Sequence, residues 1–309
     1  MKKYVILADV TCDISEEVRQ YFGVEEYIPG YVTVDGKEMQ TLLDWSLISR
    51  EEFFRNLSNK NVKVTSAPPN LAEYCEIFSK YVKEGYAVLS MSLSSRISGT
   101  YGHSCVAAQK VRDQFPEAEI YCFDSYRMSG GFGLLVCYAH RLKNEGKTFE
   151  EVIAWLEENK TRVHQMGPID DLMFIARRGR ITMGKAIMGS FAGVKPMGDC
   201  NADGYTTVLT KAKGIKKALD LTVKYVKETA EDIENQFVII SHSDRELYAK
   251  TLKDMIKKEL NPKKVFISDV FAGCGTNIGP GMIGVYYLGA PISEDLSLEK
   301  EAMNRALGK

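Results

Sequence analysis

Apolar runs and helix-spaced apolar positions alternate along the first half of the chain. Tyr4 to Ala8 form a continuous apolar run, which predicts a buried strand. Leu71, Tyr74 and Phe78 recur at the spacing of one helix face, and Gly85 ends that stretch. Alternating strands and helices favour a largely parallel sheet flanked by helices. The further elements predicted in this half are strands at 86–93 and 119–124 and helices at 103–114 and 129–145.

Short polar motifs predict where other elements begin and turn. Residues 27–39 look extended, and Asp35-Gly36 within them predicts a hairpin turn. Capping-box spacing predicts three helix starts, because its two side chains satisfy free N–H groups at a helix entrance. The three stretches are Asp13 to Glu16, Ser49 to Glu52 and Thr148 to Glu151.

The pattern changes near residue 160, where short glycine-interrupted helices are expected from 170 to 192. Two strands are then expected within 194–210, around an Asp203-Gly204 turn. The rest of the chain again mixes helices and strands, so we expect a second α/β region. Its predicted elements are helices near 212–230 and 244–259 and strands at 236–243, 264–269 and 282–289.

Length and composition set the overall class. At 309 residues the chain exceeds the size of one typical domain. We therefore expect two α/β domains, residues 1–160 and 161–309. The 45% hydrophobic and 26% charged content fits a packed core, and a net charge of −1 does not favour nucleic acid.

The cysteines and the N-terminus indicate the compartment. Seven cysteines occur without a C-x-x-C pair, which favours reduced thiols. We see no signal-peptide pattern and no apolar stretch of 18 residues. We therefore expect a cytoplasmic protein without stable membrane insertion.

A first cluster of hydroxyl side chains precedes two prolines. Thr65 and Ser66 stand before Pro68-Pro69, and proline is tolerated in the first turn of a helix. We therefore expect both hydroxyls at a helix entrance, where free backbone N–H groups favour an anion. A simple helix cap explains the same residues, so that alternative stays open.

A second hydroxyl cluster follows the predicted strand at 86–93. It surrounds Gly99, whose missing side chain permits close backbone approach to a ligand. Ligands of open α/β sheets lie outside the carboxyl ends of strands. We expect the two clusters to converge on one small anionic group, with a purely structural role as the alternative. The second cluster comprises Ser94, Ser95, Ser98, Thr100 and Tyr101.

Two glycine-rich stretches and an arginine turn are further candidates. Gly130, Gly131 and Gly133 do not form a dinucleotide fingerprint, so close helix–strand packing is the favoured reading. Residues 273–284 contain five glycines, which suits either a loop against a ligand or a tight connection between strands. The polar side chains of that loop are Thr276 and Asn277. The arginine turn carries Arg177, Arg178 and Arg180, which a solvated helix C-terminus explains; alternatively, one arginine completes an anion site or docks a partner.

Motifs of hydrolases and metal sites give little support. The sequence has no G-x-S-x-G, H-E-x-x-H or Walker A pattern. Cys274 has no evident cationic partner nearby in sequence. Asp9, Asp13 and Asp124 are better explained as helix caps than as metal ligands, so we predict no metal and no cofactor.

Taken in order, these stretches resemble the DegV family of bacterial fatty-acid-binding proteins. The resemblance spans residues 4 to about 287 and rests on TS-x-P and SS-x-x-SGT at their separation. The departures are Val10 after Asp9, Arg178 in place of a glycine, and Asn277 where the family usually has histidine. The shared motifs are ADVTCD, TSAPP, SSRISGTY, FDSYRMSGGFG, DDLMFIARRGRI, VKPM and GTNIGPGMIG.

The resemblance implies two α/β domains with a long-chain fatty acid such as palmitate held between them. Thr65 and Ser98 correspond to the family's carboxylate contacts, with Ser66, Ser95, Gly99, Thr276 and Asn277 nearby. It also implies a non-catalytic lipid-presenting subunit, whose partner would be a separate ATP-binding fatty-acid kinase. The arginines at 177, 178 and 180 would then dock the partner.

Two other functions stay open from the residues alone. One is a hydrolase or phosphotransferase that acts on a small anionic substrate through Ser98 or Cys274. The other is an interaction protein that docks a partner through the arginine turn.

Overall fold

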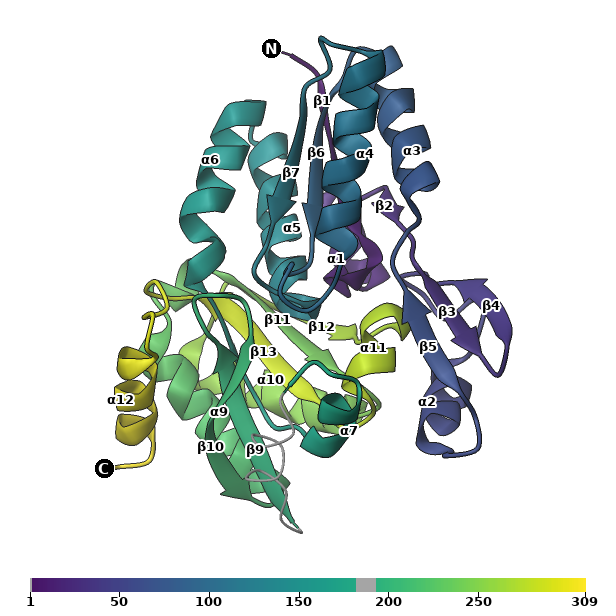
Figure 1. The fold of residues 1–309 in the computed structure, drawn as a ribbon. Coiled ribbons are helices and arrows are strands. Elements are labelled where there is room, and N and C mark those ends of the chain that lie inside the picture. The colour runs from purple at the N-terminus through teal and green to yellow at the C-terminus, as the bar shows by residue number, and fades with distance from the viewer. Residues whose placement is uncertain (1, 182–192) are drawn as a thin grey trace.

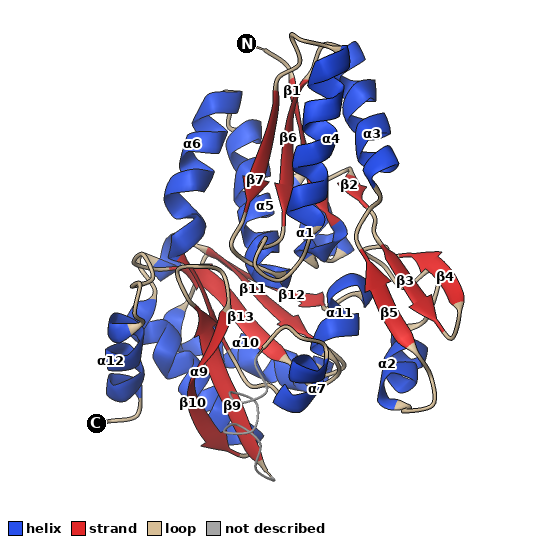
Figure 2. Ribbon diagram, viewed as in Figure 1, coloured by secondary structure: helices blue, strands red, loops and turns tan. Residues whose placement is uncertain are grey.

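The computed structural model describes residues 2–181 and 193–309. Its first sheet is parallel throughout, with strand order β2-β1-β6-β7. Helices cover both faces of this sheet, as predicted (Figures 1 and 2). The strands are β1 (Tyr4–Asp9), β2 (Tyr27–Ile28), β6 (Ala87–Ser92) and β7 (Ile120–Asp124). The helices are α1 (Glu16–Phe22), α3 (Leu71–Lys83), α4 (Thr100–Gln114), α5 (Ser129–Asn144) and α6 (Phe149–Asn159).

A second, mixed sheet lies in the other half, with strand order β12-β11-β13-β8. Its β11 and β12 are parallel, whereas β13 runs antiparallel to β11 and β8. The strands are β8 (Val163–Met166), β11 (Phe237–His242), β12 (Lys264–Asp269) and β13 (Ile283–Leu288). Helices α9 (Ile215–Thr229) and α10 (Glu246–Leu260) cover one face, and α12 (Ser297–Ala306) packs on α9.

Two smaller sheets complete the fold. A three-stranded antiparallel sheet, order β4-β3-β5, carries α2 (Arg50–Ser58) and stands beside the first sheet in Figure 1. Its strands are β3 (Tyr31–Val34), β4 (Lys37–Gln40) and β5 (Val64–Ala67). The other pairs β9 (Val194–Cys200) with β10 (Thr206–Lys213), and two short helices flank the centre, α7 (Leu172–Arg177) and α11 (Ala272–Ile278). The 3-10 helices are η1 (Val10–Cys12), η2 (Lys160–Arg162) and η3 (Ile233–Asn235).

Helix α5 lies between the two large sheets and packs on both of them (Figure 1). Its first turns are glycine-rich because the neighbours leave no room for side chains. A Cβ on Gly130 would stand 2.4 Å from Ser241 Oγ, and one on Gly133 would stand 2.2 Å from the carbonyl oxygen of Cys12. The predicted close helix–strand packing at this stretch is therefore confirmed.

The small sheet bearing α2 is tied to the second half of the chain. Phe53 and Phe54 of α2 share a core with Ala272 of α11. Asp269, at the end of β12, accepts hydrogen bonds from Trp45 Nε1 at 2.9 Å and Arg50 Nη1 at 3.2 Å. Because one continuous core also joins residues of β1 and α5 with β11 and β12, the division near residue 160 stays a prediction.

Most predicted elements occur within a few residues of the expected positions. Ser49 caps α2, Thr148 forms a capping box at α6, and Asp35-Gly36 turns the hairpin. The first helix starts after Ser15, whereas Asp13 is turned into the left-handed region just before it. Of the helices expected at 170–192, α7 is present, and 182–192 lie outside the described residues.

Three local predictions are wrong. The first is the capping box at Asp13 to Glu16, because α1 begins after Ser15 and Ser15 makes no side-chain cap hydrogen bond. Thr65 and Ser66 lie inside strand β5, not at a helix entrance, because Asn70 and Glu73 form the capping box that starts α3. The glycine-rich stretch near 273–278 forms helix α11 instead of a loop. No helix in the described ranges 2–181 and 193–309 has the length and apolar content needed to cross a bilayer.

We predict that Gly133→Ala will destabilise the fold strongly. The new methyl group would overlap the Cys12 carbonyl and Ile14, and overpacking of this kind costs about 1–3 kcal/mol. Urea unfolding of the purified protein measures the change. Gly102→Ala is the matched control, since a Cβ there meets nothing within 4 Å and alanine favours the α4 helix by about 1 kcal/mol. Equal stability of both variants would contradict the packing argument.

Candidate functional site

One elongated cavity runs between the two halves of the molecule, with an empty volume of about 1300 Å³, part of it open to solvent. Residues from both large sheets, from β5 and from α11 line it. Its walls are mostly apolar, with hydroxyl and amide groups gathered at the ends. The apolar wall includes Met128, Met166, Ile169, Leu172, Ile283 and Tyr286.

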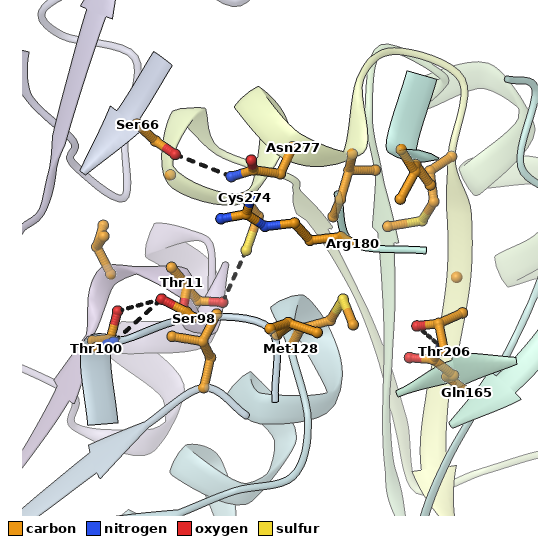
Figure 3. Close-up of a pocket in the computed structure, with 18 of the residues that line it drawn as sticks. Thr11, Ser66, Ser98, Thr100, Met128, Gln165, Arg180, Thr206, Cys274 and Asn277 are labelled. Carbon is orange, nitrogen blue, oxygen red and sulfur yellow. Dashed lines mark hydrogen bonds between the residues drawn. The ribbon is translucent and has the colours of Figure 1, made fainter. Parts of the chain in front are cut away.

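Two hydroxyls at the start of α4 form one side of the polar end (Figure 3). Ser98 Oγ and Thr100 Oγ1 are 2.8 Å apart, and Ser98 Oγ also accepts from the Thr100 backbone N–H at 3.3 Å. Both residues follow the carboxyl end of β6, the position where open α/β sheets bind ligands. The expectation for Ser98 thus agrees with its place on the cavity wall.

An amide and a hydroxyl form the opposite side of this end. Asn277 Nδ2, from α11, donates to Ser66 Oγ, from β5, at 3.0 Å (Figure 3). The pair brings together two parts of the chain 211 residues apart. The second amide hydrogen of Asn277 and the hydroxyl hydrogen of Ser66 remain available as donors to a ligand.

Arg180 supplies a positive charge near these donors. Figure 3 shows its guanidinium extending toward Asn277 and Cys274, and the residue lines the cavity. One of its amino groups donates to the Arg178 carbonyl at 2.6 Å, which fixes the turn while leaving other N–H groups for a ligand. Of the two roles left open for this arginine turn, completing an anion site or docking a partner, the place of Arg180 on the cavity wall suits the first.

The other two arginines face elsewhere. Arg177 is exposed and pairs with Asp171 at 3.3 Å. Arg178 donates to the Val64 carbonyl at 2.7 Å, and burial together with Arg177 and Arg180 lowers its pKa. Arg178 therefore ties the arginine turn to β5, and docking of a partner through Arg177 and Arg178 stays a prediction.

Four of the expected site residues do not line the cavity. Thr65 is exposed and stands on the face of β5 opposite to Ser66, since successive strand residues alternate. Ser95 is exposed and uses its backbone N–H on Asp124, at 3.1 Å. Gly99 is the exposed residue before α4, and the Thr276 hydroxyl donates a hydrogen bond to the Ala272 carbonyl at 2.9 Å. Ser66 therefore replaces Thr65 as the candidate donor.

Two buried acids lie near the polar end, and one of them, Asp9, lines the cavity. Asp9 accepts hydrogen bonds from Thr11 and from the Leu93 backbone N–H, and burial raises its pKa to about 6. Asp9 thus caps η1, as expected, and Asp124 accepts from the backbone of Ser95 and Tyr126. Over residues 2–181 and 193–309 no group of three or more potential metal ligands comes together.

Asp13, the second of these acids, joins three segments. Its carboxyl accepts from Ser129 Oγ at 2.6 Å and from the Phe271 backbone N–H at 3.0 Å, and its carbonyl accepts from Ser268 Oγ at 2.6 Å. Burial raises the pKa of Asp13 to about 8. The thiol of Cys274 lies beside it, and burial followed by the negative charge of Asp13 raises the thiol pKa well above its usual range.

The far end of the cavity carries a second polar pair that sequence reasoning missed. Gln165 Nε2, from β8, donates to Thr206 Oγ1, from β10, at 3.2 Å. Figure 3 shows this pair on the opposite side of the view from Ser98 and Ser66, with Met128 between. There was no clear sequence signal for it, because two of the four residues of β8, His164 and Gln165, are polar and no strand was predicted there.

The fold and the cavity define a class of α/β proteins with two large sheets and an internal cavity between them. The chain belongs to the DegV family: the family model described as "Uncharacterised protein, DegV family" matches residues 3–290. A DegV domain-containing protein of Clostridium perfringens, CPE0026, is 31% identical over 289 residues, which cover 94% of this chain and 98% of that protein.

Solved structures of the family have the same fold. A DegV family protein from Thermus thermophilus, described for its fatty acid binding, superposes with a TM-score of 0.82 at 25% identity, covering 94% of this chain and 100% of that one. The fatty acid kinase B3 protein of Streptococcus pneumoniae, loaded with linoleic acid, gives a TM-score of 0.79 at 16% identity, covering 93% and 99%. The predicted fold class is therefore confirmed.

We predict that Asp13→Asn will change how stability depends on pH. The wild-type carboxyl has a pKa of about 8 when folded but about 4 when unfolded, so folding binds a proton between these values. Wild-type stability therefore falls as pH rises from about 4 through 8, by up to about 1.4 kcal/mol per pH unit. Asparagine keeps the hydrogen-bonding shape without titrating, so the free energy of unfolding of the variant increases relative to that of the wild type as the pH rises through this range.

Urea unfolding at several pH values between about 5 and 8 measures that difference. Asp254→Asn removes an exposed carboxylate on α10 and serves as the matched control. A stability difference between Asp13→Asn and wild type that does not vary with pH would show that Asp13 is ionised in the folded protein.

Proposed function

We propose that this protein binds a long-chain fatty acid non-covalently and carries it as a soluble cytoplasmic protein. The carboxylate would lie among Ser66, Ser98, Asn277 and Arg180, and the acyl chain would run along the apolar wall of the cavity. The observation that carries the proposal is the combination of that polar cluster with a mostly apolar cavity continuing from it.

The energetics of the cavity suit such a ligand. A C16 acid has roughly 15 carbons beyond its carboxyl, which offer on the order of 12 kcal/mol on burial. Association costs an estimated 4–15 kcal/mol, so the tail alone leaves little net affinity. An unpaired buried carboxylate would cost several kcal/mol more. The head therefore needs donors, and the hydroxyl and amide groups at the polar end supply them.

The head-group donors are mostly neutral, which bears on what happens to the bound acid. Ser66, Ser98 and Asn277 donate without charge. Arg180 adds a positive charge but already uses one amino group on the Arg178 carbonyl, at 2.6 Å, which disfavours a tight bidentate pair with the carboxylate. A carboxylate held in this way stays nucleophilic and can attack a phosphoryl donor. Because Asn277 cannot titrate near neutral pH, the affinity it contributes does not switch on or off with protonation.

The relatives support the same ligand and suggest a partner. Solved DegV structures are described as fatty acid binding or as loaded with a fatty acid, and one of them is a fatty acid kinase B protein. By analogy, this chain presents its acid to a separate ATP-binding kinase, which forms the acyl phosphate. The chain itself would be the non-catalytic subunit, with no nucleic acid partner.

The enzyme alternatives gain no support at the expected nucleophiles. The Ser98 hydroxyl forms a hydrogen bond with the hydroxyl of Thr100, which is not a general base. The thiol of Cys274 donates to the Thr11 carbonyl at 3.4 Å, and its raised pKa disfavours the reactive thiolate. Lipid binding therefore accounts for these residues better than hydrolysis or phosphoryl transfer by this chain alone.

We predict that Ser66→Ala and Ser98→Ala will each weaken binding of hexadecanoic acid about tenfold or more, because a hydrogen bond to a charged group is worth roughly 1.5–3 kcal/mol. Displacement of a fluorescent fatty acid from delipidated protein gives the dissociation constants. Native mass spectrometry of the untreated protein should show a bound ligand of fatty-acid mass.

Thr65→Ala is the matched control, since it removes the neighbouring hydroxyl from the exposed face of β5. It should bind like wild type. Loss of affinity in Thr65→Ala with none in Ser66→Ala would reverse the assignment of the head-group donor. Failure of the wild type to bind any long-chain acid would refute the proposed function.

A further inference from the structure

The far end of the cavity has a chemistry that a plain hydrocarbon tail does not explain. Between the two ends the wall is apolar, formed by side chains such as Met128, Met166 and Ile283. At the far end the amide of Gln165 and the hydroxyl of Thr206 face each other at 3.2 Å and both line the cavity. A wall that ended in aliphatic side chains would suit a methyl terminus better.

The Gln165 amide has unused hydrogen-bonding capacity. It carries two N–H donors and a carbonyl oxygen that accepts, and the bond to Thr206 uses one donor. Thr206 stands opposite Cys200 in the register of β9 and β10, next to the thiol. The second N–H of Gln165 can therefore donate to a hydroxyl or keto oxygen of a ligand, and its carbonyl oxygen can accept from a ligand hydroxyl.

A buried carboxylate holds this end rigid. Asp199 Oδ1 accepts from the backbone N–H of Gln165 at 2.8 Å and of Cys200 at 2.7 Å, which ties β8 to β9. Its Oδ2 accepts from His164 Nδ1 at 2.7 Å and from Tyr225 at 3.1 Å. His164 Nε2 donates in turn to the Ala290 carbonyl at 2.9 Å. The polar pair is thus mounted on a fixed framework, as a selective subsite requires.

An alkyl terminus pressed against Gln165 would strip water from the amide and return no hydrogen bond. An alcohol or ketone oxygen at the same place would replace that water. Gly198 of β9 also lines the cavity, and a Cβ there would stand 2.0 Å from the Thr207 carbonyl oxygen, so this position has no room for a side chain.

From this arrangement we infer that the cavity ends in a distal polar subsite, formed by Gln165 and Thr206, that selects long-chain acids bearing a hydroxyl or keto oxygen near the tail end. The inference rests on the proposed function and deepens it by naming the ligand class. Gln165 contacts the ligand oxygen, and Thr206 orients the amide.

The test compares hexadecanoic acid with 16-hydroxyhexadecanoic acid by displacement of a fluorescent fatty acid from delipidated protein. We expect wild type to prefer the hydroxy acid over hexadecanoic acid more strongly than Gln165→Met does, because the methionine side chain has a similar length but lacks the amide. The ratio of the two dissociation constants should shift about fivefold or more, the worth of one neutral hydrogen bond. Hexadecanoic acid itself should bind Gln165→Met more tightly than wild type.

Two controls separate the subsite from the rest of the cavity. Gln109→Met makes the same exchange on the exposed face of α4 and should leave the ratio unchanged. Thr206→Val, which keeps the shape but not the hydroxyl, should shift the ratio in the same direction as Gln165→Met. 2-Hydroxyhexadecanoic acid, with its hydroxyl at the head, should show no dependence on Gln165.

Each outcome decides between the ideas. Binding of both acids with the same ratio in wild type, Gln165→Met and Thr206→Val overturns the subsite and leaves fatty-acid binding intact. Binding of neither acid by wild type overturns the proposed function and the subsite with it. A ratio that shifts in both variants but not in Gln109→Met establishes the subsite. If one of the two variants proves unstable, a shift in the other, folded variant establishes it.

Discussion

The structure depends on one steric constraint, the close approach of α5 to its neighbours on both sides. At Gly130 and Gly133 the helix backbone lies too near Ser241 and the Cys12 carbonyl for any side chain. That closeness brings the two large sheets against a single helix and gives them a shared core. The cavity opens where α5 begins, at Met128, so the same constraint sets where a ligand can lie.

The polar end of the cavity is assembled from segments that meet only through this packing. Ser66, Ser98 and Asn277 come from β5, the start of α4 and α11, and no two of them are neighbours in sequence. Asp13 joins the start of α5 to the segment before α11. Because burial favours its neutral form near pH 7, this acid links the segments without placing a full negative charge near the head-group site.

Local sequence signals were enough to predict the parallel sheet, its helices and the hairpin, because apolar runs, helix-spaced apolar positions and the Asp35-Gly36 turn each indicate one kind of element. Such local signals could not decide which of Thr65 and Ser66 faces the cavity. Adjacent residues of a strand face opposite sides, so the register of the strand decides it. Helix α11 was mistaken for a loop because glycine disfavours helices, whereas packing of Gly275 against Phe53 stabilises it here. Gln165 was missed because its hydrogen-bond partner Thr206 comes from β10, which is distant in sequence.

The small sheet with α2 shows that the two halves of the chain are interlocked. Phe53 and Phe54 are covered by α11, and Trp45 and Arg50 hold Asp269, although about 200 residues of sequence separate these partners. A polypeptide that stopped near residue 160 would leave both phenylalanines facing water. Recombination between distant relatives at that point would therefore have to exchange matching surfaces as well as halves, which favours inheritance of the chain as one unit.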